Sequence, residues 1–234
     1  MTEPSFIEIN NIIEAIPGDV CRSPQPEFLF QLSRATKGIG AIVEIGTNVG
    51  KTAIAMGYGQ KIKNGRPIFS IDIYEHPDVK KNLEKAGVAD YVTRIVLPSH
   101  QMAKQWKQPI ELLWIDGDHS YRGVCSDIKN WVPFVLVGGL IAFHDYPGHR
   151  QSKEVWRALR KYLFKNPYQF RLISDREVGS IIVFKKLPNK PTKSNPAKRI
   201  KNHLYWLYRN ARSIAVNCFP RLAKRFKDSK KTNG

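Results

Sequence analysis

Apolar and polar positions along the chain follow two periods, and their alternation predicts a sheet surrounded by helices. Short apolar runs, which are typical of buried strands, recur between segments whose apolar residues have a helix-like spacing. The expected strands cover residues 41–45, 67–73, 91–97, 110–115, 135–143, 170–174 and 179–184. The helices expected between them cover residues 51–60, 77–87, 99–106, 121–131 and 151–163. Strands that alternate with helices imply a parallel sheet.

The last two expected strands lie close enough in the chain to form a hairpin through residues 175–178. A hairpin joins antiparallel strands, so the final strand should run against the others. The predicted fold is therefore of the α/β class: a Rossmann-like, seven-stranded, mostly parallel sheet with helices on both faces and an antiparallel last strand.

The residues before the first strand predict two further helices, over 5–16 and 27–36. In the second of these, helical spacing places one set of side chains on the buried face: Phe28, Leu29, Leu32 and Ala35. We expect residues 1–36 to form an N-terminal helical cap on a central domain of residues 37–186. Such a cap either covers the mouth of a substrate site or only packs against the domain, and the sequence favours neither.

The positive charge of the chain is concentrated near its end. The net charge is +18, of which residues 1–184 contribute +4 and residues 185–234 contribute +14. This asymmetry is typical of a basic tail rather than of a basic domain. Residues 187–196 are rich in Pro, Lys and Asn, and residues 197–216 regain a helical pattern of apolar and basic positions. We expect residues 187–234 to form a linker and a basic amphipathic tail.

Aromatic residues interleave with the basic ones in this tail, at Tyr205, Trp206 and Tyr208. An interfacial helix on an anionic membrane would have this composition, and so would a segment that stacks on nucleic-acid bases. A solvated appendage is the third interpretation. The apolar stripe favours a membrane over nucleic acid, because a periodic stripe has no part in binding phosphates. Peripheral association with an anionic membrane is therefore one expectation, and a nucleic-acid partner is not expected.

The cysteines and the hydropathy point to a reducing compartment. Cys21, Cys125 and Cys218 stand far apart, which argues against a disulfide framework or a zinc knuckle. The chain has no apolar run of about 18 residues, so no transmembrane helix is expected. The N-terminus lacks the basic-then-apolar pattern of a signal peptide. We expect a cytoplasmic protein, placed at the inner face of the membrane if the tail binds lipid.

The segment from residue 41 to residue 52 predicts a strand, a glycine turn and a helix that together hold a nucleotide-like ligand. Glycines permit a tight turn, and the N–H groups of the following helix favour an anionic group. A phosphate-binding P-loop needs four residues between its glycines, whereas three separate Gly46 from Gly50 before Lys51 and Thr52. Glu44 would repel a triphosphate and suits a ligand with hydroxyls and a cationic centre. An ordinary strand–helix turn is the third alternative.

Ligands of an open parallel sheet bind beyond the carboxyl ends of its strands, so the residues that end the strands carry the candidate chemistry. The second strand ends at Asp72. This residue stands at about the distance past the glycines at which an acidic side chain meets a ribose diol. The alternative is a solvated aspartate at a strand end.

The fourth and fifth expected strands end in acidic and imidazole side chains: Asp116, Asp118, His119, His144 and Asp145. Neighbouring strands would bring these residues together. Two carboxylates and an imidazole, completed by water, can hold Mg²⁺, Mn²⁺ or Fe²⁺, and the sequence does not choose among them. The other histidine could act as a general base, because its ordinary pKa lies near neutral pH. The alternatives are a packed core histidine and, for Asp118 or Ser120, an N-cap of the following helix.

These segments, in this order and spacing, resemble class I O-methyltransferases that use S-adenosylmethionine (SAM). The resemblance covers roughly residues 24–184 and rests on Glu44-x-Gly46-x-x-x-Gly50, on Asp72, on Asp-Gly-Asp-His-Ser-Tyr at 116–121 and on the segment 138–146. The group with this Asp-Gly-Asp-His-Ser-Tyr segment, which includes metal-dependent sugar O-methyltransferases of the macrocin type, looks nearest. The catechol and caffeoyl-CoA O-methyltransferases look more distant.

The resemblance implies a role for each matching residue. It implies SAM binding by Glu44, Gly46, Asn48, Gly50, Thr52, Asp72, Ser99, His100 and Asp116. It implies a divalent cation, Mg²⁺ or Mn²⁺, held by Asp116, His144 and Asp145, with His119 as the general base. At position 144 the relatives carry a carboxylate, so the histidine of this chain is a departure from their pattern.

The implied function is methyl transfer from SAM to a hydroxyl of a small molecule, a sugar or a glycan, with metal assistance and a histidine base. Two alternatives stay open. A P-loop-like NTPase or kinase would use Lys51, with Asp116 in the place of a Walker B carboxylate. A non-catalytic SAM-fold binding module would be anchored by the basic tail.

Overall fold

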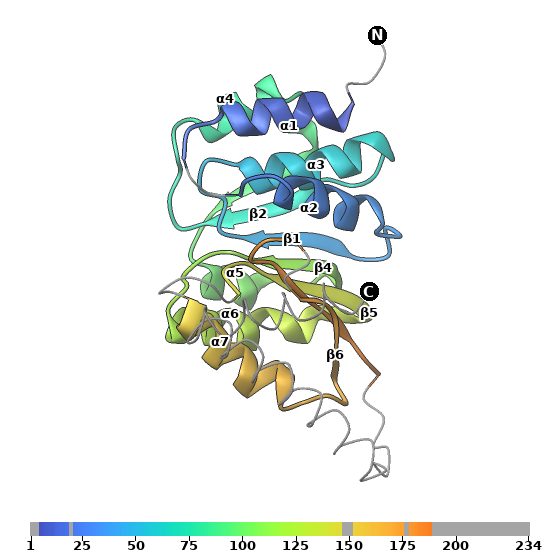
Figure 1. The fold of residues 1–234 in the computed structure, drawn as a ribbon, viewed down its shortest axis with the longest axis vertical. Coiled ribbons are helices and arrows are strands. Elements are labelled where there is room, and N and C mark those ends of the chain that lie inside the picture. Colours follow the sequence, from blue (N-terminus) through green and yellow to red (C-terminus); the bar gives the residue numbers. More distant parts are fainter. Residues whose placement is uncertain (1–4, 19–20, 147–151, 176–177, 189–234) are drawn as a thin grey trace, which may run out of the picture. The chain divides into compact units, whose positions relative to one another are not determined.

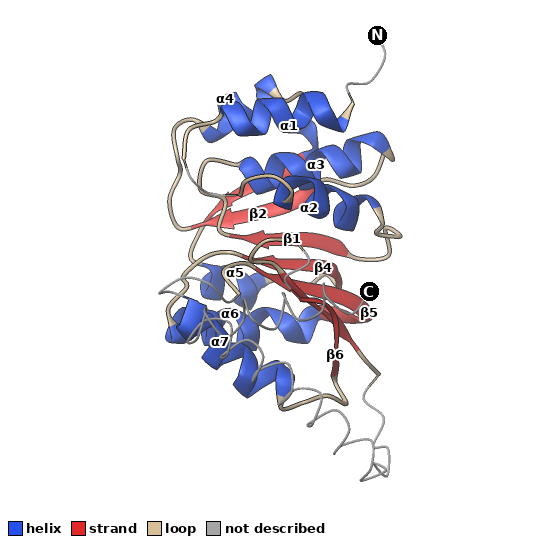
Figure 2. Ribbon diagram, in the orientation of Figure 1, coloured by secondary structure: helices blue, strands red, loops and turns tan. Residues whose placement is uncertain are grey.

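A single mixed sheet with helices on both of its faces forms the part of the protein that the computed structural model describes, residues 5–18, 21–146, 152–175 and 178–188 (Figures 1 and 2). The strands are β1 (Ala41–Ile45), β2 (Ile68–Asp72), β3 (Val92–Val96), β4 (Ile110–Ile115), β5 (Val135–Phe143), β6 (Phe170–Asp175) and β7 (Ile182–Lys186). Their order in the seven-stranded sheet is β3-β2-β1-β4-β5-β7-β6. The first five strands pair in parallel, and β7 is antiparallel to both of its neighbours. The predicted fold class is confirmed.

Two helical layers enclose the sheet. The helices are α1 (Phe6–Ala15), α2 (Gln25–Arg34), α3 (Lys51–Ile62), α4 (Val79–Lys85), α5 (Ser99–Gln105), α6 (Tyr121–Trp131) and α7 (Ser152–Leu159). A π-helical turn (Arg160–Phe164) continues α7, and short 3-10 turns (Ala89–Tyr91 and Val132–Phe134) precede β3 and β5. The core on one face is built with α1 to α4 and the core on the other face with α5 to α7 (Figure 2). None of the described helices is long and apolar enough to cross a membrane.

Helix α2 differs from its prediction in both its start and its buried face. It begins at Gln25, and its buried residues are Pro26, Leu29, Phe30 and Ser33, whereas Ala35 is exposed. Helix α2 packs closely on α3, and Ser33 Oγ donates a 2.6 Å hydrogen bond to the Met56 carbonyl. A polar residue thus lies on the inner face, which a count of apolar positions misses.

The last strand begins later than predicted, at Ile182 instead of residue 179. Gly179 has a φ of 59°, so the chain turns there instead of extending. The Tyr146 amide donates to the Ser180 carbonyl at 2.9 Å, which ties this turn to the end of β5. The turn therefore lies against the fifth strand, where it takes part in the site described below.

The strand order reverses between β1 and β4, and this reversal places the site. Ile45, Ile115 and Phe143 are in register across β1, β4 and β5. Hydrogen bonding continues just past the strand ends, because the Asp116 amide donates to the Ile45 carbonyl at 2.8 Å and the His144 amide donates to the Ile115 carbonyl at 3.1 Å. The residues that follow β4 and β5 therefore lie side by side at the switch point, where open α/β sheets bind ligands.

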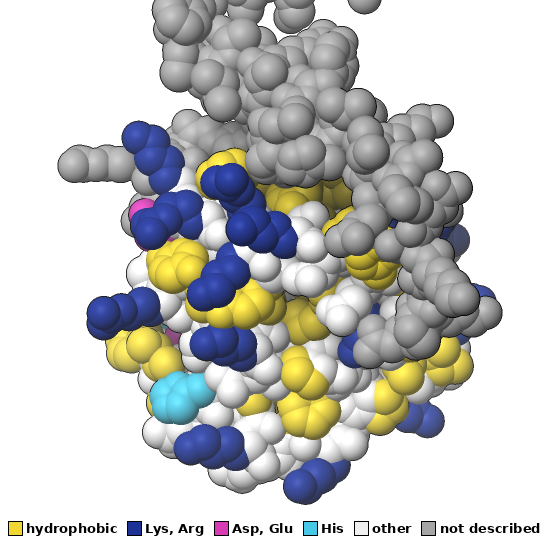
Figure 3. Space-filling model, turned by 90° about the horizontal axis from the view of Figure 1, so that it is seen from below, with side chains coloured by type: hydrophobic (Ala, Val, Ile, Leu, Met, Phe, Trp, Pro, Cys, Tyr) yellow, Lys and Arg dark blue, Asp and Glu magenta, His cyan; other side chains and the backbone are white. Residues whose placement is uncertain are grey.

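Basic side chains are frequent on the side of the molecule where α6 and α7 lie, and acidic ones are few there (Figures 1 and 3). Several of the cations lie over aromatic rings. Arg157 lies 4.8 Å from the ring centroid of Tyr121, and Arg160 lies 5.3 Å from that of Trp156. The predicted linker and basic tail, residues 187–234, lie outside the described residues apart from 187 and 188.

Candidate active site

The loop that follows β1 is shaped by residues with left-handed backbone angles. Gly46 has a φ of 96°, Asn48 of 47° and Gly50 of 89°. A Cβ atom on Gly46 would lie 2.2 Å from the Asp116 carbonyl oxygen, so no larger residue fits between β1 and β4. The Gly50 amide donates a 2.8 Å hydrogen bond to the Thr47 carbonyl, which closes the turn, and α3 begins at the next residue. The loop is therefore compact and directs the N-terminus of α3 toward the switch point.

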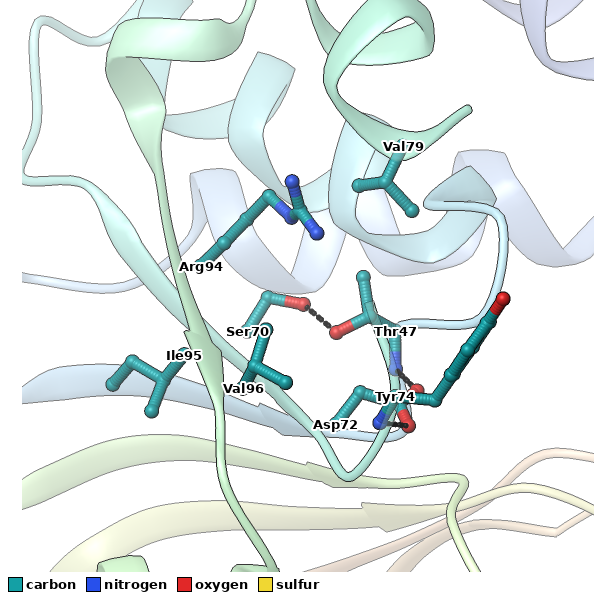
Figure 4. Close-up of a pocket in the computed structure, with 8 residues that line it drawn as sticks. All are labelled: Thr47, Ser70, Asp72, Tyr74, Val79, Arg94, Ile95 and Val96. Carbon is teal, nitrogen blue, oxygen red and sulfur yellow. Dashed lines mark hydrogen bonds between the residues drawn. The ribbon is translucent and has the colours of Figure 1, made fainter. Parts of the chain in front are cut away.

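Asp72, at the end of β2, fixes this loop. Its Oδ2 accepts a hydrogen bond from the backbone amide of Thr47 at 2.8 Å, and its Oδ1 accepts one from the Tyr74 amide at 3.2 Å (Figure 4). The Asn48 amide also donates to Oδ2, at 3.0 Å. A carboxylate offers about four acceptor positions, so Asp72 retains capacity for a further donor. A small pocket adjoins it, lined by Thr47, Ser70, Asp72, Tyr74, Val79, Arg94, Ile95 and Val96 (Figure 4).

Glu44 lies beneath the loop and does not reach the surface. Its exposed fraction is 0%, and its two carboxylate oxygens accept hydrogen bonds from the hydroxyls of Thr52 and Ser70. The Ser70 hydroxyl also lies 2.6 Å from that of Thr47. Burial raises the pKa of Glu44 to about 8. Glu44 and Thr52 thus support the loop from below, whereas Asn48 in the loop is exposed.

Lys51, the residue that a P-loop would use for phosphate, is turned away from the loop. Its exposed fraction is 4%, and its Nζ donates to the Gly18 carbonyl at 2.9 Å. The amine therefore ties the segment after α1 to the start of α3. This arrangement leaves no exposed ammonium group at this position for a triphosphate.

Two aspartates and two histidines form a closed cluster just past β4 and β5. His119 Nε2 lies 3.1 Å from Asp116 Oδ1, and its Nδ1 lies 3.0 Å from Asp145 Oδ2. His144 Nδ1 lies 3.2 Å from both Asp116 Oδ1 and Asp145 Oδ1. Asp145 has a φ of 55°, a left-handed angle that aspartate tolerates better than most residues. Each imidazole therefore bridges the same two carboxylates.

The protonation of this cluster is strongly coupled. Hydrogen bonds with Asp116 and Asp145 raise the pKa of His119 to about 10. For His144, burial lowers the pKa, but hydrogen bonds with the same carboxylates outweigh burial and raise the pKa to about 9. Hydrogen bonds from the two histidines hold the pKa of Asp145 well below its usual range. The contacts in the cluster thus favour the protonated form of both histidines and the ionised form of Asp145.

The donor set of this cluster fits a divalent cation. One ligand atom each from Asp116, His119 and His144 lies within 4.8 Å of the others, and Asp145 contacts both histidines. Two carboxylates and two imidazoles are ligands of first-row divalent metals. His119, predicted as a base, therefore also stands where a ligand could, and the predicted ligands Asp116, His144 and Asp145 are brought together.

Asp118 takes a different place from the other four predicted residues. Its Oδ1 accepts a hydrogen bond from the Ser120 amide at 2.8 Å, and its Oδ2 accepts one from the Ser120 hydroxyl at 2.9 Å. Ser120 is the N-cap of α6, and its hydroxyl accepts from the Gly123 amide at 3.1 Å. The two residues fix the start of α6, as the capping alternative predicts.

Comparison with known proteins agrees with this arrangement. Residues 43–146, which contain the loop after β1 and the Asp/His cluster, match the model of a methyltransferase domain. The solved structure of an O-methyltransferase from Bacillus cereus with SAH is similar with a TM-score of 0.58, at 20% identity over 77% of this chain and 90% of that one. The O-methyltransferase TomG from Streptomyces achromogenes, solved with SAM, is similar with a TM-score of 0.60, at 15% identity over 80% of this chain and 92% of that one. The fold is that of the SAM-dependent methyltransferases.

A sequence relative is an uncharacterized protein of Acanthamoeba polyphaga mimivirus. It is 33% identical over an alignment of 144 positions that covers 56% of this chain. The match spans 65% of that relative's length, a little under two thirds.

In this methyltransferase fold, the segment after β3 lies against α6. Ser99 Oγ donates a 2.5 Å hydrogen bond to Asp127 Oδ1, and His100 is exposed. Burial raises the pKa of Asp127 to about 6. Asp127 was not predicted as a site residue, although an acidic residue between the buried Val124 and Ile128 on an amphipathic helix is an available signal.

Gln25 and Ser180 also belong to the site and were not predicted. Gln25 Oε1 lies 3.2 Å and Ser180 Oγ lies 3.1 Å from His144 Nε2. Gln25 Nε2 donates to Ser180 Oγ at 3.1 Å. Neither residue stands in a motif, and each comes from a turn or helix start far from β5 in sequence, so no local signal could have revealed them.

Proposed function

We propose that this protein is a SAM-dependent O-methyltransferase that acts on a hydroxyl of a small molecule, a sugar or a glycan. The observation that carries the proposal is the Asp/His cluster, which stands at the switch point beside a compact loop held by Asp72. The methyltransferase-domain match over the same residues and the fold support SAM as the methyl donor.

The chain's own residues have three tasks in this reaction. Asp72 accepts hydrogen bonds from the ribose hydroxyls of SAM. It also accepts hydrogen bonds from the backbone amides of the loop that borders the ribose. The loop after β1 and the Asp/His cluster hold the donor methyl and the acceptor oxygen at attack distance, which can supply a large part of the rate in such transfers. As the acceptor oxygen forms its bond to the methyl carbon and the sulfur–carbon bond breaks, the neutral form of His119 takes the acceptor's proton. Because Asp116 and Asp145 raise the pKa of His119 to about 10, this neutral form is populated chiefly at alkaline pH.

A divalent cation would be held by Asp116, His144 and Asp145. Bound there, it would orient the acceptor oxygen and lower the pKa of its hydroxyl. The carboxylates that would hold the cation are also those that hold His119, at 3.1 and 3.0 Å, so the proposed base and the proposed metal site share their partners.

An NTPase or kinase is disfavoured, because Lys51 is buried against the Gly18 carbonyl. The direct test incubates the full chain with radiolabelled SAM, Mg²⁺ or Mn²⁺ and a panel of glycosyl and catechol acceptors, beside calorimetric titrations with SAM and with ATP. We expect SAM to bind, ATP not to bind, and label to transfer to at least one hydroxyl acceptor. Binding of ATP in preference to SAM would contradict the proposal, and SAM binding without transfer to any acceptor would favour a binding module.

We expect Asp72→Asn to weaken SAM binding by roughly 10- to 100-fold, because a hydrogen bond to a charged acceptor contributes about 1.5–3 kcal/mol. The amide keeps an oxygen for the loop's backbone donors, so the loop should persist. Calorimetric titration with SAM measures the change. Asp90→Asn, at an exposed aspartate of the 3-10 turn before β3, is the control, and equal affinity in the two variants would remove the ribose role.

We expect His119→Ala to lower turnover by roughly 100- to 10,000-fold, the usual contribution of a general base, with little change in SAM affinity. Single-turnover transfer of labelled methyl and calorimetry with SAM measure the two quantities. His76→Ala, outside the cluster, is the control. Unchanged turnover would exclude the base role. A loss of metal affinity as large as the loss of turnover would instead make His119 a ligand.

A further inference from the structure

The imidazole of His144 is held on both of its nitrogens by different parts of the chain. Nδ1 faces Asp116 and Asp145, at 3.2 Å from each. Nε2 faces Gln25 Oε1 at 3.2 Å and Ser180 Oγ at 3.1 Å. The side chain of His144 is 11% exposed, so the ring is enclosed by these four partners and by Trp114, whose ring centroid lies 5.8 Å away.

Gln25 and Ser180 form a support that is itself packed in place. Gln25 stands at the start of α2, and its Nε2 donates to Ser180 Oγ at 3.1 Å. A Cβ atom on Gly179 would lie 2.6 Å from Gln25 Nε2, so the turn before β7 closes directly on the amide group. The support therefore joins the N-terminal helices, the last turn of the sheet and the Asp/His cluster.

The hydrogen-bond partners in this support select one tautomer of the neutral imidazole. Because Gln25 presents its carbonyl oxygen to Nε2, the proton of a neutral His144 lies on Nε2. The lone pair of Nδ1 then points at the space between the carboxylates. Metal-ligating histidines are commonly fixed in this way by an acceptor on the other ring nitrogen, which also makes the ligand more basic.

We propose that Gln25 and Ser180 are positioning residues that present His144 Nδ1 to a metal ion between Asp116 and Asp145, and that this imidazole makes the centre select a transition-metal ion over Mg²⁺. The inference deepens the proposed function, since it concerns the metal of the same site. Imidazole suits Fe²⁺, Co²⁺, Ni²⁺ and Zn²⁺, whereas Mg²⁺ prefers carboxylate and water oxygens. Position 144 therefore determines the metal preference of the centre.

The test is calorimetric titration of the full chain with Co²⁺ and, separately, with Mg²⁺. The wild-type chain should bind Co²⁺ more tightly than Mg²⁺, and His144→Asp should lower the ratio of the two affinities by roughly tenfold or more. Gln25→Leu should weaken Co²⁺ binding by roughly 10- to 100-fold, the usual effect of removing an outer partner of a ligand. Gln25→Glu keeps an acceptor oxygen and should restore Co²⁺ binding.

Two further variants keep the result interpretable. Gln31→Leu changes an exposed glutamine of the same helix and should leave both affinities unchanged. Ser180→Ala removes one hydroxyl without adding bulk and should weaken Co²⁺ binding if Gln25→Leu fails to fold. An unchanged affinity ratio in His144→Asp, or unchanged Co²⁺ binding in both Gln25→Leu and Ser180→Ala, would overturn the inference. Labelled methyl transfer measured on the same samples separates this outcome from failure of the proposed function, because transfer could persist while metal selection by His144 is disproved.

Discussion

Gly46→Ala should destabilise the protein by about 3 kcal/mol or more, because the new methyl group meets the backbone of Asp116, just past the end of β4. The Cβ would lie 2.2 Å from the Asp116 carbonyl oxygen and 2.6 Å from its carbonyl carbon. Asp116 is itself held by the hydrogen bond from its amide to Ile45 at 2.8 Å. The strain therefore falls on both the loop after β1 and the Asp/His cluster, and we expect SAM binding to be lost together with stability. Urea denaturation and calorimetry with SAM measure the two effects.

Gly38→Ala is the matched control for this prediction. Gly38 also has a positive φ, of 77°, but a Cβ there would have no atom within 4 Å. This variant therefore carries the backbone strain alone, about 1–2 kcal/mol, without the contact. If the two variants lose the same stability, close approach of the loop to β4 has no energetic consequence and the assignment of Gly46 as a contact glycine is wrong.

The strands and the site-bearing edge of the sheet could be predicted from the sequence because a buried parallel strand leaves two signals, an apolar run and a change to polar residues where the run ends. The apolar run of β4 ends at Asp116, and that of β5 ends at His144, so the change from apolar to chemically active residues shows both the boundary and the candidate site. The order of strands then follows from general rules for α/β sheets. This strand order makes β4 and β5 neighbours. It is therefore enough to bring four of the five predicted side chains close together.

What the sequence could not predict depends on contacts between segments that are far apart. Gln25 reaches His144 because α2 begins where the last turn of the sheet closes, a fact that no spacing in α2 contains. Glu44 shows a second limit. A carboxylate inside the apolar run of β1 suggests a ligand contact, whereas its partners in the structure are the hydroxyls of Thr52 and Ser70 inside the domain. The position of a residue along a strand can thus be predicted from the sequence. The partners of its side chain can be known only when the neighbouring elements are in place.

The burial of Glu44 should make the stability of the protein depend on pH, and Glu44→Gln should remove this dependence. The pKa of the folded state is raised from 4.5 to about 8 by burial. Between these two pH values the folded state retains a proton that the unfolded state has released, so the free energy of unfolding should fall as the pH rises. The slope from this one group is about 1.4 kcal/mol per pH unit, and it ends above pH 8.

Glutamine resembles the protonated carboxyl, because it offers one acceptor and one donor group to Thr52 and Ser70, and it does not titrate. The difference in the free energy of unfolding between wild type and Glu44→Gln should therefore be constant below about pH 4.5. Between pH 4.5 and pH 8 the variant should gain stability relative to wild type, by several kcal/mol in total. The raised pKa values of His119 and His144 also lower stability as the pH rises, but both proteins share them, so they cancel in the difference. Guanidinium denaturation at pH 5, 6, 7 and 8 measures the two curves. Parallel curves would mean that Glu44 is already ionised in the folded protein at pH 5, with Thr52 and Ser70 outweighing its burial.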